Sequence, residues 1–158
     1  MQTSATRRRK VLESFSRIPG HLIRRVHQVS TAYFTEECGG GLTAVQYAAL
    51  VAIESHPGID ATRLSTVIYF DRSTIGDVLD RIESKGWIVR QSTDADRRIK
   101  SLMIAPAGQA VLRQVAPGIR RVQERLLAPL TPGEAKTLVR LLVKMADAGD
   151  VDDDDDGV

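Results

Sequence analysis

Apolar residues recur every three or four positions along most of this chain, which is the spacing of an amphipathic helix. Breaks rich in glycine or proline separate the repeats, and the pairs Thr43/Gln46 and Thr131/Glu134 have the spacing of helix-capping boxes. The pattern predicts helices over about 21–37, 43–55, 61–67, 72–85, 106–126 and 132–145.

The pattern changes after the fourth predicted helix, where two short runs favour strands. Trp87–Gln91 and Ile99–Ile104 are rich in β-prone residues, and the polar stretch 92–98 separates them. A hairpin with a charged tip is therefore expected. Two short helices followed by a hairpin form the order of a winged helix-turn-helix. The expected fold class is mainly α with a small β-hairpin wing.

The charge distribution adds a second feature. Six of the 20 acidic side chains lie in the last nine residues, which leaves residues 1–149 with 22 basic and 14 acidic groups. A basic body indicates a polyanionic partner such as nucleic acid, although a solvated basic surface would give the same excess. The mutually repelling carboxylates predict a disordered acidic tail at 148–158.

The composition also bears on where the protein works. No apolar run approaches the length of a membrane span, and the basic residues 1–10 lead into no apolar segment of the kind that a signal peptide needs. Cys38 is the only cysteine, so no internal disulfide can form. We therefore expect a cytoplasmic location.

The predicted helix at 72–85 has an apolar and a polar side. Small and polar residues begin the polar side, which suits a helix entering the major groove of DNA, although an ordinary amphipathic surface helix has the same two sides. At the hairpin tip, two arginines offer guanidinium groups to a narrow minor groove beside one carboxylate that can orient them. The candidate DNA-binding residues are Arg72, Ser73, Thr74, Gly76, Asp77, Arg81, Asp96, Arg97 and Arg98.

These candidates have different expected roles. Arg72 can reach guanine or phosphate, and the hydroxyl groups of Ser73 and Thr74 can donate to base edges or phosphates. Asp77 can accept a hydrogen bond from a cytosine amino group.

Three segments together resemble the recognition helix and wing of the MarR family of transcriptional regulators. They are Asp71–Trp87, Ser92–Arg98 and Leu102–Gly108, and the resemblance extends over about 20–146. Ala105 departs from the threonine that the family usually has there, which removes a helix cap. The resemblance implies a homodimer that binds a pseudo-palindromic double-stranded DNA operator and represses transcription.

The resemblance also divides the chain. It implies an N-terminal dimerisation helix at 1–42, a DNA-binding lobe at 43–105 and C-terminal dimerisation helices at 106–147, followed by the tail. In the helix at 106–126, apolar residues spaced by three and four agree with a seam between helices, although an intramolecular core is the alternative. The expected dimer residues are Leu112, Val115, Ile119, Val122, Leu126, Leu138, Leu141 and Leu142.

The first predicted helix carries a polar row beside its apolar stripe. His21, Arg25 and Gln28 lie at i, i+4 and i+7, where the arginine can pair with a small aromatic carboxylate through two hydrogen bonds. Dimer salt bridges or contact with solvent would explain the same row. MarR-like proteins often bind aromatic acids between the dimerisation lobe and the DNA-binding lobe. The resemblance therefore adds Tyr47 and Phe70 to the expected effector site.

The sequence allows more than one interpretation of what controls the protein and of what its winged helix binds. The run 19–28 resembles that of MarR-type regulators of pyridine-carboxylate (nicotinate) breakdown, which favours such an acid as effector. A redox switch at Cys38 is the alternative, although Glu36 and Glu37 would raise its pKa. A winged helix can also serve protein–protein contact. The sequence holds no Gly-rich phosphate loop, nucleophile elbow or His/Cys metal spacing, so neither an enzyme nor a bound metal or cofactor is expected.

Overall fold

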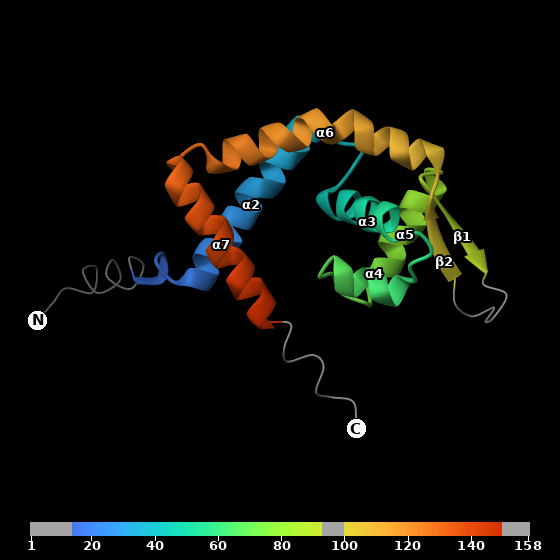
Figure 1. Cartoon of the computed structure of the whole chain (residues 1–158), viewed down its shortest axis with the longest axis horizontal. Helices are drawn as coiled ribbons and strands as arrows, with labels where there is room; N and C mark the ends of the chain where they lie inside the picture. The colour runs from blue at the N-terminus through green and yellow to red at the C-terminus, as the bar shows by residue number, and fades with distance from the viewer. Residues whose placement is uncertain (1–13, 93–99, 150–158) are drawn as a thin grey trace, which may run out of the picture. The chain divides into compact units, whose positions relative to one another are not determined.

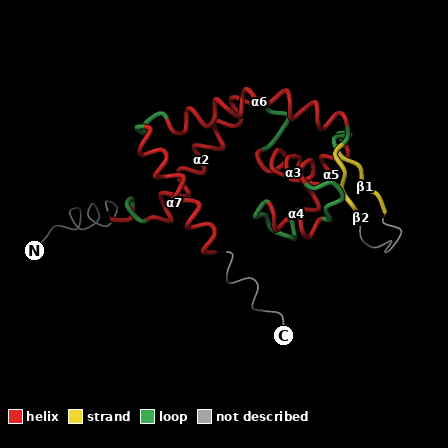
Figure 2. The backbone as a smooth tube through the Cα atoms, viewed as in Figure 1, coloured by secondary structure: helices red, strands yellow, loops and turns green. Residues whose placement is uncertain are grey.

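The computed structural model describes residues 14–92 and 100–149, which form a mainly helical chain with one antiparallel hairpin (Figure 1, Figure 2). The order of elements confirms the predicted fold class. No helix in these two ranges is both long and apolar enough to cross a lipid bilayer. The elements are α2 (Pro19–Cys38), α3 (Ala44–Ser55), α4 (Ala61–Val67), α5 (Ile75–Ser84), β1 (Ile88–Ser92), β2 (Lys100–Ile104), α6 (Pro106–Leu127) and α7 (Pro132–Gly149).

The chain divides into two compact units, 1–122 and 123–158. The first unit contains α2 to α5, both strands and most of α6, whereas the second contains the end of α6 and all of α7. The lobe expected at 43–105 is thus part of a larger unit that also includes α2 and most of α6.

The core of the first unit lies where α3, α4 and α5 meet the base of the hairpin. The predicted apolar stripe of α5 is buried throughout, and its burial removes apolar surface from water and fixes which side of α5 faces outward. The largest side chains with less than 2% of their surface exposed are Leu50, Ile53, Leu64, Ile82, Ile88 and Leu102.

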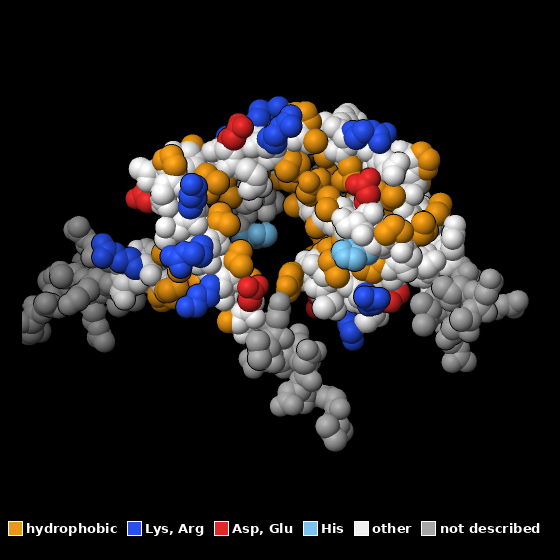
Figure 3. Space-filling view, in the orientation of Figure 1, with side chains coloured by type: hydrophobic (Ala, Val, Ile, Leu, Met, Phe, Trp, Pro, Cys, Tyr) orange, Lys and Arg blue, Asp and Glu red, His pale blue; other side chains and the backbone are white. Residues whose placement is uncertain are grey.

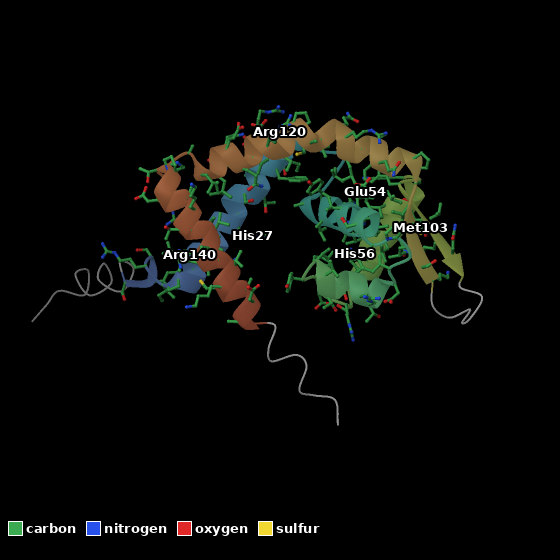
Figure 4. All side chains as sticks on the ribbon, in the orientation of Figure 1. His27, Glu54, His56, Met103, Arg120 and Arg140 are labelled. Atoms are coloured by element: carbon green, nitrogen blue, oxygen red, sulfur yellow. The ribbon has the colours of Figure 1, made fainter. Side chains whose placement is uncertain are left out.

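The two strands pair antiparallel, with Ile88 opposite Ile104 and Arg90 opposite Leu102. Leu102 also bridges to Ile59 ahead of α4, so the hairpin is attached to the helical part of the unit at this residue. Leu102 is buried, whereas the next residue on β2, Met103 (Figure 4), faces the other side of the strand. This alternation is the one that the sequence predicts.

The start of α5 differs from the predicted one. The helix begins at Ile75 and not at Arg72. Asp71 causes the delay, because its Oδ1 accepts a hydrogen bond from the N–H of Ser73 at 2.6 Å and holds the next residues in a turn. The carbonyl of Asp71 then accepts from the N–H of Ile75 at 3.1 Å, which leads the chain into the helix.

The end of α5 sets where the hairpin begins. Gly86 has a φ of +70°, and the N–H of Trp87 donates to the carbonyl of Ile82 at 3.0 Å. Because Trp87 closes the helix in this way, β1 begins at Ile88, one residue later than predicted. The predicted strand residue Ile99 lies outside the described residues.

Both predicted capping boxes form. The side chain of Thr43 accepts from the N–H of Gln46, and the side chain of Gln46 accepts from the N–H of Thr43, each at 3.2 Å. At the start of α7, the carboxylate of Glu134 accepts from the N–H of Thr131 at 2.8 Å, which lowers the pKa of Glu134. These bonds satisfy helix donors that have no partner in the first turn.

Helix α6 approaches two other segments closely at glycines. A Cβ at Gly108 would lie 2.2 Å from the carbonyl oxygen of Trp87, and a Cβ at Gly118 would lie 2.5 Å from that of Glu37. Arg121 Nε also pairs with Glu37 Oε2 at 2.6 Å. The start of α6 therefore packs on the base of the hairpin, and its middle packs on the end of α2.

Candidate nucleic-acid interface

Helix α5 presents a polar side to solvent. Gly76, Asp77 and Arg81 are exposed, and so are residues 72–74 in the turn ahead of the helix. A Cβ at Gly76 would meet no atom within 4 Å, so packing inside the chain does not require glycine there. Its bare backbone allows another molecule to approach closely. All six predicted contact residues on α5 and its leading turn are thus exposed.

The two hydroxyl groups ahead of α5 already have hydrogen-bond acceptors. Ser73 Oγ donates to Oδ1 of Asp71 at 2.5 Å, and Thr74 Oγ1 donates to the carbonyl of Asp71 at 3.2 Å. The bonds from Ser73 also hold the pKa of the Asp71 carboxyl below its ordinary value. Donation to DNA therefore requires each hydroxyl group to leave its Asp71 acceptor, and this expected role stays a prediction. Their oxygens remain acceptors, which suits the amino groups of bases.

An arginine that the sequence analysis missed connects α5 to the hairpin. Arg90 on β1 pairs through Nη2 with Asp80 Oδ1 at 2.6 Å and through Nε with Glu83 Oε2 at 3.3 Å. The Arg90 side chain is 21% exposed, but Asp80 and Glu83 are 66% and 39% exposed, so solvent screens both pairs. They link β1 of the wing to the exposed side of α5.

The structure describes the wing only along its two strands. Ser92 and Lys100 pair at the outer end of the hairpin, and the chain between them carries Asp96, Arg97 and Arg98. These three residues lie outside the described residues, so their contact with DNA stays a prediction.

The predicted effector residues have different surroundings. Arg25 and Gln28 are exposed on α2, whereas His21 is half-buried with its ring 4.4 Å from that of Phe15. Tyr47 on α3 packs against the core with its ring 6.0 Å from that of Phe34.

Of the five predicted effector residues, only Phe70 lines one of the cavities described. It lines a cavity of about 270 Å³ that none of the other four predicted effector residues lines. The remaining lining residues are Thr43, Val45, Gln46, Thr74, Asp77, Val78 and Arg81. Phe70 is therefore associated with the α5 surface here, and a single effector site for all five residues stays a proposal.

The expected dimer residues fall into two groups, apart from Leu126, which is half-buried near the end of α6. Val115 and Val122 are buried in the core of the first unit, and Leu112 and Ile119 pack against that core. The intramolecular alternative thus accounts for these four positions in a single chain. On α7, by contrast, large apolar side chains reach the surface (Figure 3). The exposed ones are Leu138, Val139, Leu141, Leu142, Val143 and Met145.

Cys38 has surroundings that disfavour a reactive thiolate. Burial and the nearby charge of Glu37 raise the pKa of the thiol, and the opposing effect of Arg121 is smaller. A thiol with a raised pKa holds little thiolate at neutral pH, so it reacts slowly with oxidants. These surroundings give the redox alternative no support.

Comparison with known proteins shows which family this chain matches. The family model described as "MarR family" matches residues 42–100, which run from the start of α3 to the start of β2. The chain is 28% identical over 130 residues to the HTH-type transcriptional repressor NicR of Pseudomonas putida, which covers 82% of each protein. It is 30% identical over 125 residues to the transcriptional regulator HosA of Escherichia coli, which covers 79% of this chain and 92% of HosA.

A solved structure extends the similarity to the fold. That structure is of BpsR from Bordetella bronchiseptica, and it is described as showing the mechanism by which 6-hydroxynicotinic acid regulates DNA binding. The two structures superimpose with a TM-score of 0.80 at 28% identity, over 84% of this chain and 96% of that one. The similarity thus covers the winged helix and the helices on both sides of it in the sequence.

Proposed function

Because the chain belongs to the MarR family of transcriptional regulators, we propose that it is a repressor that binds a pseudo-palindromic operator as a homodimer and is released by a small aromatic acid. One observation carries the DNA-binding part. Helix α5 buries its whole apolar stripe and exposes a small polar side, and backbone bonds at Trp87 and Leu102 attach the wing to the same unit. A rigid exposed helix next to a wing is the geometry that reads a major groove and the adjacent minor groove.

In this proposal α5 lies in the major groove with its first turns toward the bases. Arg72 contacts guanine or a phosphate, Asp77 accepts from cytosine, and Arg81 lies one turn further along the same side of the helix. Arg97 and Arg98 contact the minor groove from the wing.

Replacing Arg72 by alanine should weaken operator binding by about 1–3 kcal/mol, because one guanidinium contact is lost. Binding is measured by fluorescence anisotropy at several salt concentrations. If Arg72 contacts a phosphate, the slope of log affinity against log salt falls by about one. Arg113→Ala on α6 is the control, since it removes an exposed cation that has no assigned contact. Equal affinities of wild type and Arg72→Ala, at every salt concentration, would contradict the assigned role.

The effector part of the proposal rests on α2 and on one similar protein of known structure. The BpsR structure concerns the regulation of DNA binding by 6-hydroxynicotinic acid, and the row at 21–28 on α2 offers a cation beside an imidazole and an amide. Arg25 is exposed and thus accessible to a carboxylate. We therefore assign the effector to the class of small aromatic acids that includes pyridine carboxylates.

Adding 6-hydroxynicotinate should weaken the protein–operator complex at least about fivefold, because coupling between two sites is typically 1–3 kcal/mol. Arg25→Ala should abolish this release and leave operator affinity without acid nearly unchanged. The neighbouring Arg24→Ala is the matched control, because it removes an equal charge from another side of α2. A fully responsive Arg25→Ala variant would exclude Arg25 as the carboxylate partner.

A further inference from the structure

Helix α5 and the two strands of the wing line a common cavity of about 500 Å³. The start of α4 completes its lining. On α5 the lining includes Gly76, which is exposed and where a Cβ would meet no atom within 4 Å. The cavity therefore adjoins the side of α5 that the proposed function places in the major groove.

Cationic side chains reach this cavity from separate elements. Arg63 on α4 and Lys100 on β2 both line it, and both are exposed. Neither forms an ion pair with another residue in the described ranges. Arg90 on β1 lines the cavity too, but its charge is already matched by Asp80 and Glu83. The two cations available to a bound molecule are thus Arg63 and Lys100.

One carboxylate, that of Asp60, lines the same cavity. Its Oδ1 accepts a hydrogen bond from the N–H of Arg63 at 2.9 Å and so caps α4. The charge of Asp60 offsets only one of the two available cations, so the lining keeps a net positive charge. Positive charge that converges on one cavity from a helix and a strand favours an anion as its occupant.

We propose that this cavity binds a phosphate of the DNA backbone, with Arg63 and Lys100 as its cationic contacts. This inference rests on the proposed DNA-binding function. In a duplex, a sugar–phosphate backbone separates the major groove from the adjacent minor groove. If α5 occupies the major groove and the wing occupies the minor groove, that backbone must pass between α5 and the wing, where the cavity lies. Arginine and lysine are common phosphate contacts, and the bare backbone at Gly76 allows a close approach.

Lys100→Gln and Arg63→Gln should each weaken DNA binding about tenfold per bound subunit, the loss expected for one hydrogen bond to a charged group. The slope of log affinity against log salt should become shallower by about one per bound subunit, because one fewer phosphate is neutralised. Affinity should fall equally for the operator and for an unrelated duplex, because a phosphate carries no sequence information. Fluorescence anisotropy measures both duplexes at several salt concentrations.

Two further variants separate a lost contact from a lost charge or a damaged fold. Lys100→Arg keeps the cation and should bind nearly like wild type. Arg120→Gln removes an equal charge from an exposed residue of α6 (Figure 4) that lines none of the cavities described, so affinity and slope should not change. Because Arg63 and Lys100 are exposed, their glutamine variants should melt at the wild-type temperature.

Neutral methylphosphonate linkages, placed one at a time in the operator, locate the phosphate. The linkage that lies in the cavity should cost the wild-type protein about tenfold in affinity. The same linkage should cost Lys100→Gln much less, because the contact is already lost. The proposal is overturned if no linkage shows this difference, or if Lys100→Gln and Arg63→Gln bind both duplexes with the wild-type affinity and slope. A wild-type protein that binds neither duplex overturns the proposed function itself.

Discussion

Gly108→Ala should lower the free energy of unfolding by about 3 kcal/mol, at the upper end of the usual range for overpacking. The added Cβ would lie 2.2 Å from the carbonyl oxygen of Trp87 and 3.0 Å from Cγ1 of Ile104. The Trp87 oxygen belongs to the backbone and accepts a hydrogen bond from the N–H of Ala105 at 2.9 Å. A side-chain rotation cannot relieve this clash, so α6 must move away from the base of the wing.

Gly133→Ala is the matched control for this prediction. Gly133 also lies near the start of a long helix, but a Cβ there would meet no atom within 4 Å. Alanine should therefore stabilise α7 by about 0.5–1 kcal/mol through its higher helix propensity. Urea unfolding at one fixed protein concentration measures both variants, because the stability of a dimer depends on concentration. Equal stabilities of the two variants would contradict the close packing at Gly108.

Leu142→Asp should convert the protein to a monomer and weaken operator binding about a hundredfold or more, since linked half-site binding is lost. Leu142 is one of the apolar side chains that α7 exposes in a single chain, and the proposed dimer covers it. Burying an unpaired carboxylate in that interface is costly, so the subunits should separate. Sedimentation at micromolar concentration measures the oligomeric state, and anisotropy measures operator affinity.

The control for Leu142→Asp places the same carboxylate elsewhere on α7. Lys136 is exposed and lies about 120° or more around the helix from Leu138, Leu141 and Leu142, given 3.6 residues per turn. Lys136→Asp should remain a dimer and bind the operator like wild type. A Leu142→Asp protein that is still dimeric would show that α7 does not form the interface through this side.

The helices could be predicted because their signals are local. The spacing of apolar residues depends on neighbours three or four positions away, and the capping box at Thr43 depends on the same range. The small shift at the start of α5 has a local cause too, because Asp71 bonds to a residue two positions later. The exposed polar side of α5 followed from the same periodicity, so the candidate DNA-binding surface was largely accessible from sequence.

What sequence could not show depends on contacts between distant segments. The spacing of Val115 and Val122 identifies an apolar face, but does not say whether the same chain or a partner covers it. The Arg90 pairs join a strand to α5, and periodicity within either element does not reveal them. The spacing of apolar residues does not predict the left-handed backbone of Tyr69 either, because such a position at a helix end usually holds glycine.

Selection of bound duplexes from a random pool by the wild-type protein tests the central claim most directly. A homodimeric winged helix-turn-helix repressor should enrich one two-fold symmetric sequence, with half-site centres about one helical turn or 34–36 Å apart. Its affinity for that duplex should exceed that for an unrelated duplex by about a thousandfold or more at physiological salt. A pool that yields no common sequence, or equal affinity for both duplexes, would contradict the claim that this chain reads DNA.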